Sequence, residues 1–204
     1  MFNNYKKLIK RIIDFVSSLV GLVLLFPVFL IISIMIKLTS NGPILFKQVR
    51  IGRYAKEFIL IKFRTMVKNT ENDGTGSITI AGDNRITTIG KFLRKWKLDE
   101  LPSLWNVLKG DMSLVGPRPD VPGYADKLEG NDRRILELYP GITGPATLKY
   151  SNEEKILMNV DGLVKYNDEV IFLDKVKINL EYLDNWSFWL DIMIILKTIF
   201  RIPK

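Results

Sequence analysis

The sequence predicts an α+β protein that is mostly helical, with an N-terminal helix-break-helix hairpin in a membrane and a small globular domain behind it. Three observations predict this class. A long uncharged apolar segment with a central proline lies near the N-terminus, two runs of β-type residues flank a short turn, and helical apolar spacing recurs through most of the remainder. We place the membrane part at residues 1–40 and the globular domain at residues 41–204.

Composition limits the chemistry that this chain can perform. It has 204 residues, enough for one domain of ordinary size and an anchor. It contains no cysteine and no histidine, which excludes disulfides, a thiolate nucleophile and the usual general base. Catalysis must therefore depend on carboxylates, lysine, arginine, tyrosine or a hard oxygen-bound cation. The net charge of +8 indicates an anionic partner: nucleic acid, acidic lipid or a phosphorylated small molecule.

The apolar segment from Phe15 to Ile36 has 22 residues without a formal charge. As a straight helix it would be about 33 Å long, enough for a hydrocarbon core of about 30 Å. Pro27 lies near its midpoint and removes a helical hydrogen bond, which predicts a break there. A kinked span and a hairpin that re-enters the same leaflet both fit these observations.

Basic residues flank the apolar segment on both sides, and the positive-inside rule then places both ends in the cytoplasm, as a re-entrant hairpin requires. They are Lys6, Lys7, Lys10 and Arg11 before it, and Lys37, Lys47, Arg50, Arg53 and Lys56 after it. Arg11 and Asp14 lie three residues apart at the entrance and can pair on one helix face, which would lower the cost of an acid near the membrane. Simple flanking charge is the alternative.

The globular domain opens with a predicted β-hairpin. The stretch from Gly42 to Met66 has two runs of β-type residues around a Gly52-Arg53 turn. The polar, glycine-rich residues 67–85 that follow are predicted to be a loop.

A basic amphipathic helix is predicted next. Its apolar residues Ile89, Phe92, Leu93 and Trp96 fall at i, i+3, i+4 and i+7. Five basic residues and no acid lie between residues 85 and 97, which suits solvent or lipid headgroups.

Asp99 and Glu100 form the main candidate site. Asp99 is predicted at or near the N-cap of a second helix that ends at Gly110, so capping alone is one interpretation. A helix N-terminus also binds anions, and Arg118, held between two prolines, suits contact with phosphate. Two carboxylates among cations indicate phosphoryl chemistry, in which one binds a divalent cation and the other attacks or orients.

The C-terminal third is predicted to be mainly helical. Residues 139–145 read as a rigid Pro/Gly turn that either shapes a pocket or is only structural. Residues 154–186 look helical and charged. In residues 185–204 a narrow polar stripe predicts an amphipathic helix for the membrane interface, with a core-packing helix as the alternative. The stripe and its extension comprise Asp184, Asp191, Thr198 and Arg201.

Several sequence motifs, taken together, allow this chain to be compared with a known family. They are "KRIIDF", the proline-broken apolar segment, "GPILFKQVRIGR", "IKFRTM", "DNRITTIGKFLRK", "LDELPSLWNVLKGDMSLVGPRP" and "PGITG". On these motifs the chain resembles the small monotopic phosphoglycosyl transferases of the bacterial sugar transferase family. The resemblance covers nearly the whole chain, and the block around Asp99 is its most specific part.

The resemblance implies an activity and a location. Members transfer a sugar-1-phosphate from a UDP-sugar to polyprenyl phosphate, typically undecaprenyl phosphate, and release UMP, which is the first membrane step of bacterial glycoconjugate synthesis. It implies a re-entrant segment broken at Pro27 and an enzyme on the cytoplasmic face of the bacterial inner membrane, among its lipids. A homodimer is one of the assemblies that the sequence allows.

The resemblance also assigns roles to residues. Asp99 would be the nucleophile on the sugar-bearing phosphorus, Glu100 would help to hold Mg²⁺, and Arg118 would bind phosphate. Further charge neutralisation is expected from Arg94, Lys62 or Arg64. No general base is needed, because a phosphate monoester has a second pKa of about 6 and both nucleophiles are already ionised near neutral pH.

The chain departs from the common family pattern in two places. "PGITG" continues as "PATLKYSNEE" where many members have Trp-Ala-Gln-Val-Asn-Gly, and Asn179 stands where many have an aspartate. Both changes put the identity of the sugar in doubt.

Two other functions stay open: direct transfer with Asp99 only on the metal, and a membrane-anchored protein that binds nucleic acid or acidic lipid. The second is disfavoured, and no nucleic acid is expected, because the positive charges surround the apolar segment and the acidic pair.

Overall fold

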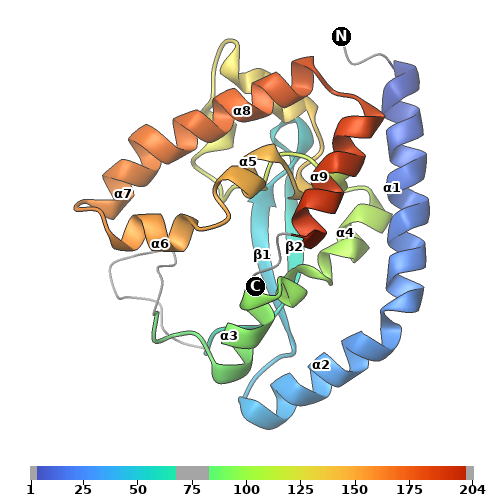
Figure 1. Ribbon diagram of the computed structural model, residues 1–204, viewed down its shortest axis with the longest axis vertical. Helices are drawn as coiled ribbons and strands as arrows, with labels where there is room; N and C mark the ends of the chain where they lie inside the picture. The colour runs from blue at the N-terminus through green and yellow to red at the C-terminus, as the bar shows by residue number, and fades with distance from the viewer. Residues whose placement is uncertain (1–3, 68–82, 201–204) are drawn as a thin grey trace.

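The computed structural model describes residues 4–67 and 83–200 and has the predicted α+β class, with helices dominating (Figure 1). Residues 68–82 of the predicted loop lie outside the described residues. The helices are α1 (Asn4–Leu24), α2 (Phe26–Thr39), α3 (Thr88–Lys95), α4 (Ser103–Lys109), α5 (Pro145–Lys149), α6 (Glu153–Met158), α7 (Leu163–Tyr166), α8 (Leu173–Asp184) and α9 (Phe188–Phe200). The strands are β1 (Leu45–Ile51), β2 (Glu57–Phe63), β3 (Ser113–Val115) and β4 (Gly141–Thr143).

The apolar N-terminal segment forms two helices that meet at a bend of 60°. Pro27 lies in the first turn of α2, where its missing N–H has no helical partner to lose. In the described part of the chain, no single helix has the length and hydropathy for a bilayer, and only α1 and α2 taken together reach them. Figure 1 shows α1 along one side of the domain and α2 turning beneath it. The break at Pro27 is therefore present, while its topology in a membrane stays a prediction.

The predicted β-hairpin is confirmed, with a longer turn than expected. Strands β1 and β2 pair antiparallel from Leu45 opposite Phe63 to Ile51 opposite Glu57. Five residues connect them instead of the Gly-Arg pair, closed by a hydrogen bond from Gly52 N to the Lys56 carbonyl at 2.8 Å. Tyr54 and Ala55 both adopt positive φ in this turn. The turn residues could not be read from the sequence, because neither of these two is a type that favours that conformation.

A second, two-stranded sheet lies where the sequence predicted only a turn. Strand β4 comes from the Pro/Gly-rich stretch and pairs parallel with β3. The backbones approach closely: a Cβ on Gly116 would lie 2.2 Å from the Tyr139 carbonyl oxygen, and one on Gly141 would lie 2.1 Å from the Gly116 nitrogen. These glycines are therefore needed for contact between the two strands, as well as for turning the chain.

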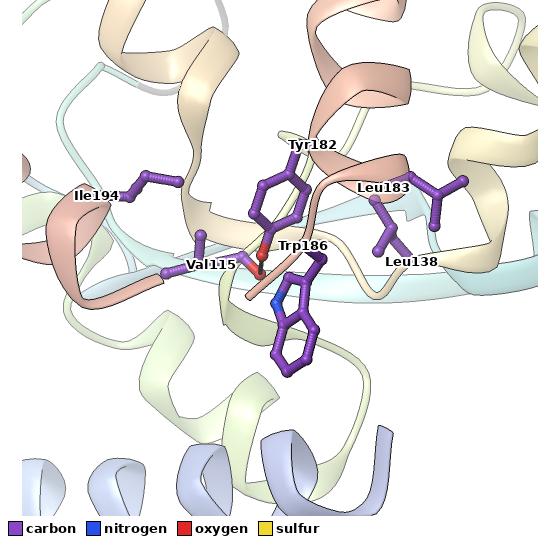
Figure 2. Packing of buried hydrophobic residues seen from close by; sticks show 6 residues of the cluster. All are labelled: Val115, Leu138, Tyr182, Leu183, Trp186 and Ile194. Carbon is purple, nitrogen blue, oxygen red and sulfur yellow. Dashed lines mark hydrogen bonds between the residues drawn. The ribbon is translucent and has the colours of Figure 1, made fainter. Parts of the chain in front are cut away.

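The largest buried cluster joins β3 to the two C-terminal helices. It consists of Val115, Leu138, Tyr182, Leu183, Trp186 and Ile194 (Figure 2). The hydroxyl oxygen of Tyr182 lies 3.4 Å from the carbonyl oxygen of Val115, as the dashed line in Figure 2 shows. The same hydroxyl donates to Oδ1 of Asp191 at 2.5 Å. This cluster holds α8 and α9 against the strand that leads to Arg118.

Helix α9 is amphipathic, but its polar stripe faces the protein. Asp191 is buried and accepts hydrogen bonds from Lys10 Nζ at 2.5 Å and from Trp186 Nε1 at 3.1 Å. Thr198 lies 2.6 Å from the hydroxyl of Thr143. The exposed face is apolar and includes Phe188, Trp189, Met193, Leu196, Ile199 and Phe200. The helix thus packs on the core through its polar stripe and Ile194, as the core-packing alternative expected. A role of the exposed apolar face at the membrane interface stays a prediction.

Candidate active site

The acidic pair lies in a short turn between two helices. Helix α3 begins after Thr87, whose Oγ1 accepts a hydrogen bond from Gly90 N at 2.9 Å. It ends before Lys97, which has a left-handed backbone, and Leu98–Glu100 then form one 3₁₀ turn. Helix α4 starts only at Ser103, with Pro102 in the cap position. The predicted capping role of Asp99 is therefore wrong, because the chain makes a separate turn before the helix begins.

The predicted apolar stripe of α3 is half buried. Ile89 and Leu93 pack into the core, whereas Phe92 and Trp96 are exposed. The buried pair contacts Ile32 and Ile36 of α2 in one hydrophobic cluster. Helix α3 therefore rests on the N-terminal helix pair and presents aromatic side chains beside its basic residues.

Helix α4 is fixed to the free edge of β2 by two buried polar side chains. Asn106 donates to the Ile59 carbonyl at 2.8 Å and accepts from Ile61 N at 3.1 Å, so its amide replaces a missing strand. Ser103 donates to the Ile61 carbonyl at 3.0 Å. Neither residue was predicted from the sequence; their signal was two polar side chains three apart, interspersed with Leu104, Trp105, Val107 and Leu108. They set the position of the turn that carries Asp99 and Glu100.

Glu100 is the centre of a buried ion cluster. Its Oε1 accepts hydrogen bonds from Lys62 Nζ at 2.7 Å and from Arg118 Nη2 at 3.0 Å. Burial alone would raise the pKa of Glu100, but the charges of Lys62, Arg118 and Lys97 outweigh it and hold that pKa well below its usual range. Burial in turn lowers the pKa of Lys62, partly offset by Glu100. The structure therefore places two other predicted site residues, Lys62 and Arg118, on an ionised Glu100.

Asp99 has the opposite environment. Burial and the neighbouring charge of Glu100 raise the pKa of Asp99, and Lys62, Lys97 and Arg94 only partly offset them. No group among the described residues donates a hydrogen bond to its buried Oδ1. A buried carboxylate oxygen without a hydrogen-bond donor costs folding free energy. The fold therefore holds this oxygen of Asp99 in place without stabilising it. Asp99 therefore differs from Glu100, whose Oε1 accepts two hydrogen bonds.

Arg118 is presented by a rigid segment. The carbonyl of Pro117 accepts from Gly141 N at 2.7 Å, and the carbonyl of Asp120 accepts from Ile51 N at 2.9 Å. The guanidinium is partly exposed, with 40% of the side chain accessible, although it binds Glu100. It can therefore contact a ligand while Glu100 fixes its orientation.

Arg50 and Asp120 belong to the same site and were not predicted. Arg50 donates to the Pro119 carbonyl at 3.1 Å and to Oε1 of Gln48 at 2.7 Å. Burial and the nearby charge of Arg118 lower the pKa of Arg50 to about 10. Burial raises the pKa of Asp120 to about 6, against the charges of Lys175 and Arg50. The position of Asp120 directly after the Pro-Arg-Pro element was the available signal.

The other predicted residues have different surroundings. Arg64 is buried and binds the carbonyls of Ser40 and Asn41, so it closes the end of α2 and does not join the cluster around Glu100. Arg94 pairs with Glu154 and remains close enough to Asp99 to affect its pKa.

Arg11 and Asp14, predicted as a pair, bind separate backbone groups. Arg11 donates to the carbonyls of Val107 and Leu108, and Asp14 accepts from Leu114 N.

The acidic pair suits a Mg²⁺ ion only in part. Within the described ranges, no group of three or more Asp or Glu side chains is placed to hold a metal ion by itself. Mg²⁺ is commonly held by one or two carboxylates together with substrate phosphates and water. The orphan Oδ1 of Asp99 and the adjacent Glu100 are hard oxygen donors of that kind. The residues present therefore fit a Mg²⁺ ion that arrives with a phosphorylated ligand.

Asn179 also leaves a buried oxygen unsatisfied. The side chain is 5% exposed, and its Oδ1 has no donor within the described part of the chain. The same holds for the hydroxyl of Thr147 on α5, which packs against α8. Both atoms lie in the two stretches where the sequence departs from the common family pattern.

Comparison with known proteins identifies the family. A family model described as "Bacterial sugar transferase" matches residues 5–204. The chain is 38% identical over 197 residues to a UDP-N-acetylgalactosamine-undecaprenyl-phosphate N-acetylgalactosaminephosphotransferase of Aeromonas hydrophila, covering 94% of this chain and 43% of that protein. It is 38% identical over 202 residues to a UDP-glucose:undecaprenyl-phosphate glucose-1-phosphate transferase of Escherichia coli (strain K12), covering 96% and 40%.

A shorter relative aligns over most of its own length. The uncharacterized sugar transferase EpsL of Bacillus subtilis (strain 168) is 35% identical over 195 residues, covering 96% of this chain and 87% of that protein. By contrast, the chain spans about two fifths of the two longer relatives. The match to the family model over nearly the whole chain, together with these identities, shows that the chain belongs to the bacterial sugar transferase family.

Proposed function

We propose that this protein transfers a sugar-1-phosphate from a UDP-sugar to polyprenyl phosphate, through a covalent intermediate on Asp99. The observation that carries the proposal is the environment of Asp99: a buried oxygen without a hydrogen-bond donor, beside Lys62, Lys97 and Arg94. The names of the Aeromonas and Escherichia relatives supply the substrate class. The product would be a polyprenyl diphosphate-linked sugar, the first membrane intermediate of a bacterial glycoconjugate.

The proposed reaction has two displacements at one phosphorus. An oxygen of Asp99 attacks the sugar-bearing phosphorus of the donor, and the bond from that phosphorus to the bridging oxygen breaks, so UMP leaves with the electron pair. A phosphate oxygen of the polyprenyl phosphate then attacks the same phosphorus and displaces Asp99. Neither step requires a proton, since carboxylate and phosphate are both anionic near neutral pH. The absence of histidine from the sequence is therefore compatible with the reaction.

The residues around Asp99 would neutralise the charge that gathers at the phosphorus. Arg118 is partly exposed and already oriented by Glu100, so it can bind a phosphate oxygen with little reorganisation. Lys62 lies on the same carboxylate and adds a second positive charge. Glu100 and phosphate oxygens of the donor would hold Mg²⁺, which supplies further charge neutralisation when bound.

The apolar surface supports a location at a membrane. Large apolar side chains are exposed along α1, α2 and α9, which is typical of a surface that contacts lipid. Polyprenyl phosphate is a lipid, and its phosphate must meet Asp99 at the level of the headgroups. We place the protein on the cytoplasmic face of the bacterial inner membrane, with α1 and α2 re-entrant, because UDP-sugars are cytoplasmic.

The test is UMP release by the full chain in detergent micelles with undecaprenyl phosphate. UDP-glucose, UDP-galactose and UDP-N-acetylgalactosamine serve as donors, each with and without Mg²⁺. We expect Mg²⁺-dependent UMP release with at least one donor, and a phosphosugar adduct on the Asp99 peptide by mass spectrometry when the acceptor is left out. Turnover without any adduct would favour direct transfer, and no UMP from any UDP-sugar would overturn the proposed function.

A further inference from the structure

Helix α1 is bound directly to both segments that carry the candidate site. Arg11 donates to the carbonyls of Val107 at 2.6 Å and Leu108 at 2.9 Å, in the last turn of α4. One turn further along α1, the Oδ1 of Asp14 accepts from Leu114 N at 3.0 Å, in the middle of β3. Together with the bond from Lys10 to Asp191 of α9, these contacts bind the first helix of the apolar N-terminal segment to the globular domain at three points, two of which lie on the segments that carry the site.

The Arg11 contact fixes the direction of α4. The last carbonyls of a helix have no partner within it, and a cation there also complements the helix dipole. Helix α4 has only seven residues, and the turn with Asp99 and Glu100 precedes its first residue. Because the helix is short and rigid, a displacement of its C-terminal end also displaces its N-terminal end. Holding the carboxyl end of α4 therefore also determines where the acidic turn lies.

The Asp14 contact fixes the register of β3. This strand pairs with β4 on one side, through Ser113 and Val115. The N–H of Leu114 points to the other side, where the Asp14 carboxylate takes the place of a missing strand. Arg118 follows four residues later, and the chain between is constrained by the close packing of Gly116 on Gly141 and by Pro117. A shift of β3 would therefore move Arg118.

We propose that Arg11 and Asp14 are positioning residues for the transfer reaction: from one helix they set the position of the Asp99–Glu100 turn relative to Arg118. The proposal rests on the proposed function. It gives the N-terminal helix a role in catalysis beyond holding the protein at a membrane. The sequence suggested that Arg11 and Asp14 form a charge pair with each other. In the structure Arg11 binds α4 and Asp14 binds β3, so the two contacts reach the two segments that carry the site.

The first test is a double-mutant cycle between Asp14 and Arg118, measured as UMP release by the full chain with the most active of the three UDP-sugar donors. Misplacement of a catalytic group by about 1 Å can cost up to a hundredfold, so we expect Asp14→Ala to lower kcat by about ten- to a hundredfold with a smaller change in KM. In an Arg118→Ala background, Asp14→Ala should cost little more, because its effect passes through Arg118. Losses that multiply would overturn the proposal.

Two further variants separate positioning from stability and from charge. Asp14→Asn keeps an oxygen that accepts from Leu114 N and should retain most of the kcat. Ser18→Ala is the matched control, since Ser18 is buried on the same face of α1 and its hydroxyl donates to the Phe15 carbonyl within the same helix. It should keep wild-type kcat. Equal kcat for Asp14→Ala and Ser18→Ala, with equal thermal midpoints, would overturn the proposal.

Arg11 is tested in the same assay. Arg11→Ala should lower kcat, and Arg11→Lys, which keeps the charge and can reach one carbonyl, should restore part of it. An Arg11→Ala protein with wild-type kcat would remove Arg11 from the proposal. Wild-type protein that releases no UMP would overturn the proposed function and the positioning role together, whereas normal wild-type turnover with unaffected variants would overturn the positioning role alone.

Discussion

At the scale of single residues, the pKa values of two adjacent acids are shifted in opposite directions. Asp99 and Glu100 are neighbours in sequence, yet burial and the charge of Glu100 raise the pKa of Asp99, while Lys62 and Arg118 lower the pKa of Glu100. Carboxylates whose environments push their pKa values apart commonly have separate roles in one site. Here Glu100 organises the cations, and Asp99 is the carboxylate that we propose as the nucleophile.

Removing the charge of Asp99 should stabilise the protein while it abolishes turnover. A raised pKa means that the fold favours the neutral carboxyl, so the ionised form costs stability at pH 7. Asp99→Asn should therefore raise the melting temperature at pH 7. Turnover should fall by roughly a thousandfold or more. Tryptophan fluorescence during heating and UMP release measure the two effects.

Asp83→Asn is the control, for which the opposite change in melting temperature is expected. Hydrogen bonds from Arg85 lower the pKa of Asp83, so its ionised form contributes stability that is lost as pH falls. This substitution should lower the melting temperature at pH 7. A lower melting temperature for Asp99→Asn as well would contradict the interpretation of Asp99 as an unsatisfied carboxylate.

Asp120 should make donor binding depend on pH. Its pKa of about 6 means that it becomes negative as pH rises from 5 to 7, close to Arg50, Lys175 and Arg118. The added negative charge competes with the donor's diphosphate, so affinity for a UDP-sugar should fall across this window. Calorimetric titration at several pH values measures it. Asp120→Asn should flatten the dependence, and a variant that keeps the full wild-type dependence would show that another group is responsible.

At the scale of secondary structure elements, the site depends on how α4 is held on β2. The side chain of Asn106 binds Ile59 and Ile61 as a neighbouring strand would, and it is 1% exposed. The backbone edge of a two-stranded hairpin is thereby satisfied without a third strand. This arrangement joins the strand that carries Lys62 to the helix that follows Glu100, so their ion pair forms between two elements that are already fixed.

Asn106→Ala should destabilise the fold by about 2–6 kcal/mol, because it leaves one N–H and one carbonyl of β2 without partners at about 1–3 kcal/mol each. Urea unfolding in detergent, followed by tryptophan fluorescence, measures the change. Asn185→Ala is the matched control, since Asn185 is exposed and its amide binds only the carbonyl of Glu181 one turn earlier. Similar unfolding midpoints for both variants would contradict the bridging role of Asn106.

The sequence predicted these elements better than their contacts. Hydrophobic spacing located the hairpin and α3, and the acidic pair with the Pro-Arg-Pro element located the site. Arg64 was expected to neutralise charge at the site, but β2 ends at Phe63 and the Arg64 guanidinium binds the carbonyls of Ser40 and Asn41. Asn106 and Arg11 were missed as contacts because local sequence carries no record of which edge or helix end a distant segment will cover.

At the scale of the whole molecule, two apolar surfaces lie on the same protein as a charged site. The bent pair α1 and α2 and the outer face of α9 expose apolar side chains, and α1 is joined to α9 by the Lys10–Asp191 ion pair. A buried ion pair of this kind is costly to break on one side, which favours a fixed relation between the two helices. The helix pair and α9 should therefore meet the lipid together.

The re-entrant arrangement predicts that the N-terminus and the globular domain lie on the same side of the membrane. The chain has no cysteine, so one introduced thiol reports on one position. Asn4→Cys marks the start of α1, and Glu129→Cys marks an exposed position in the domain. Basic residues on both sides of the apolar segment favour cytoplasmic ends for both. In spheroplasts, an impermeant maleimide should label neither thiol until the membrane is permeabilised, and then both. Labelling of Asn4→Cys alone in intact spheroplasts would show that the bent pair crosses the bilayer.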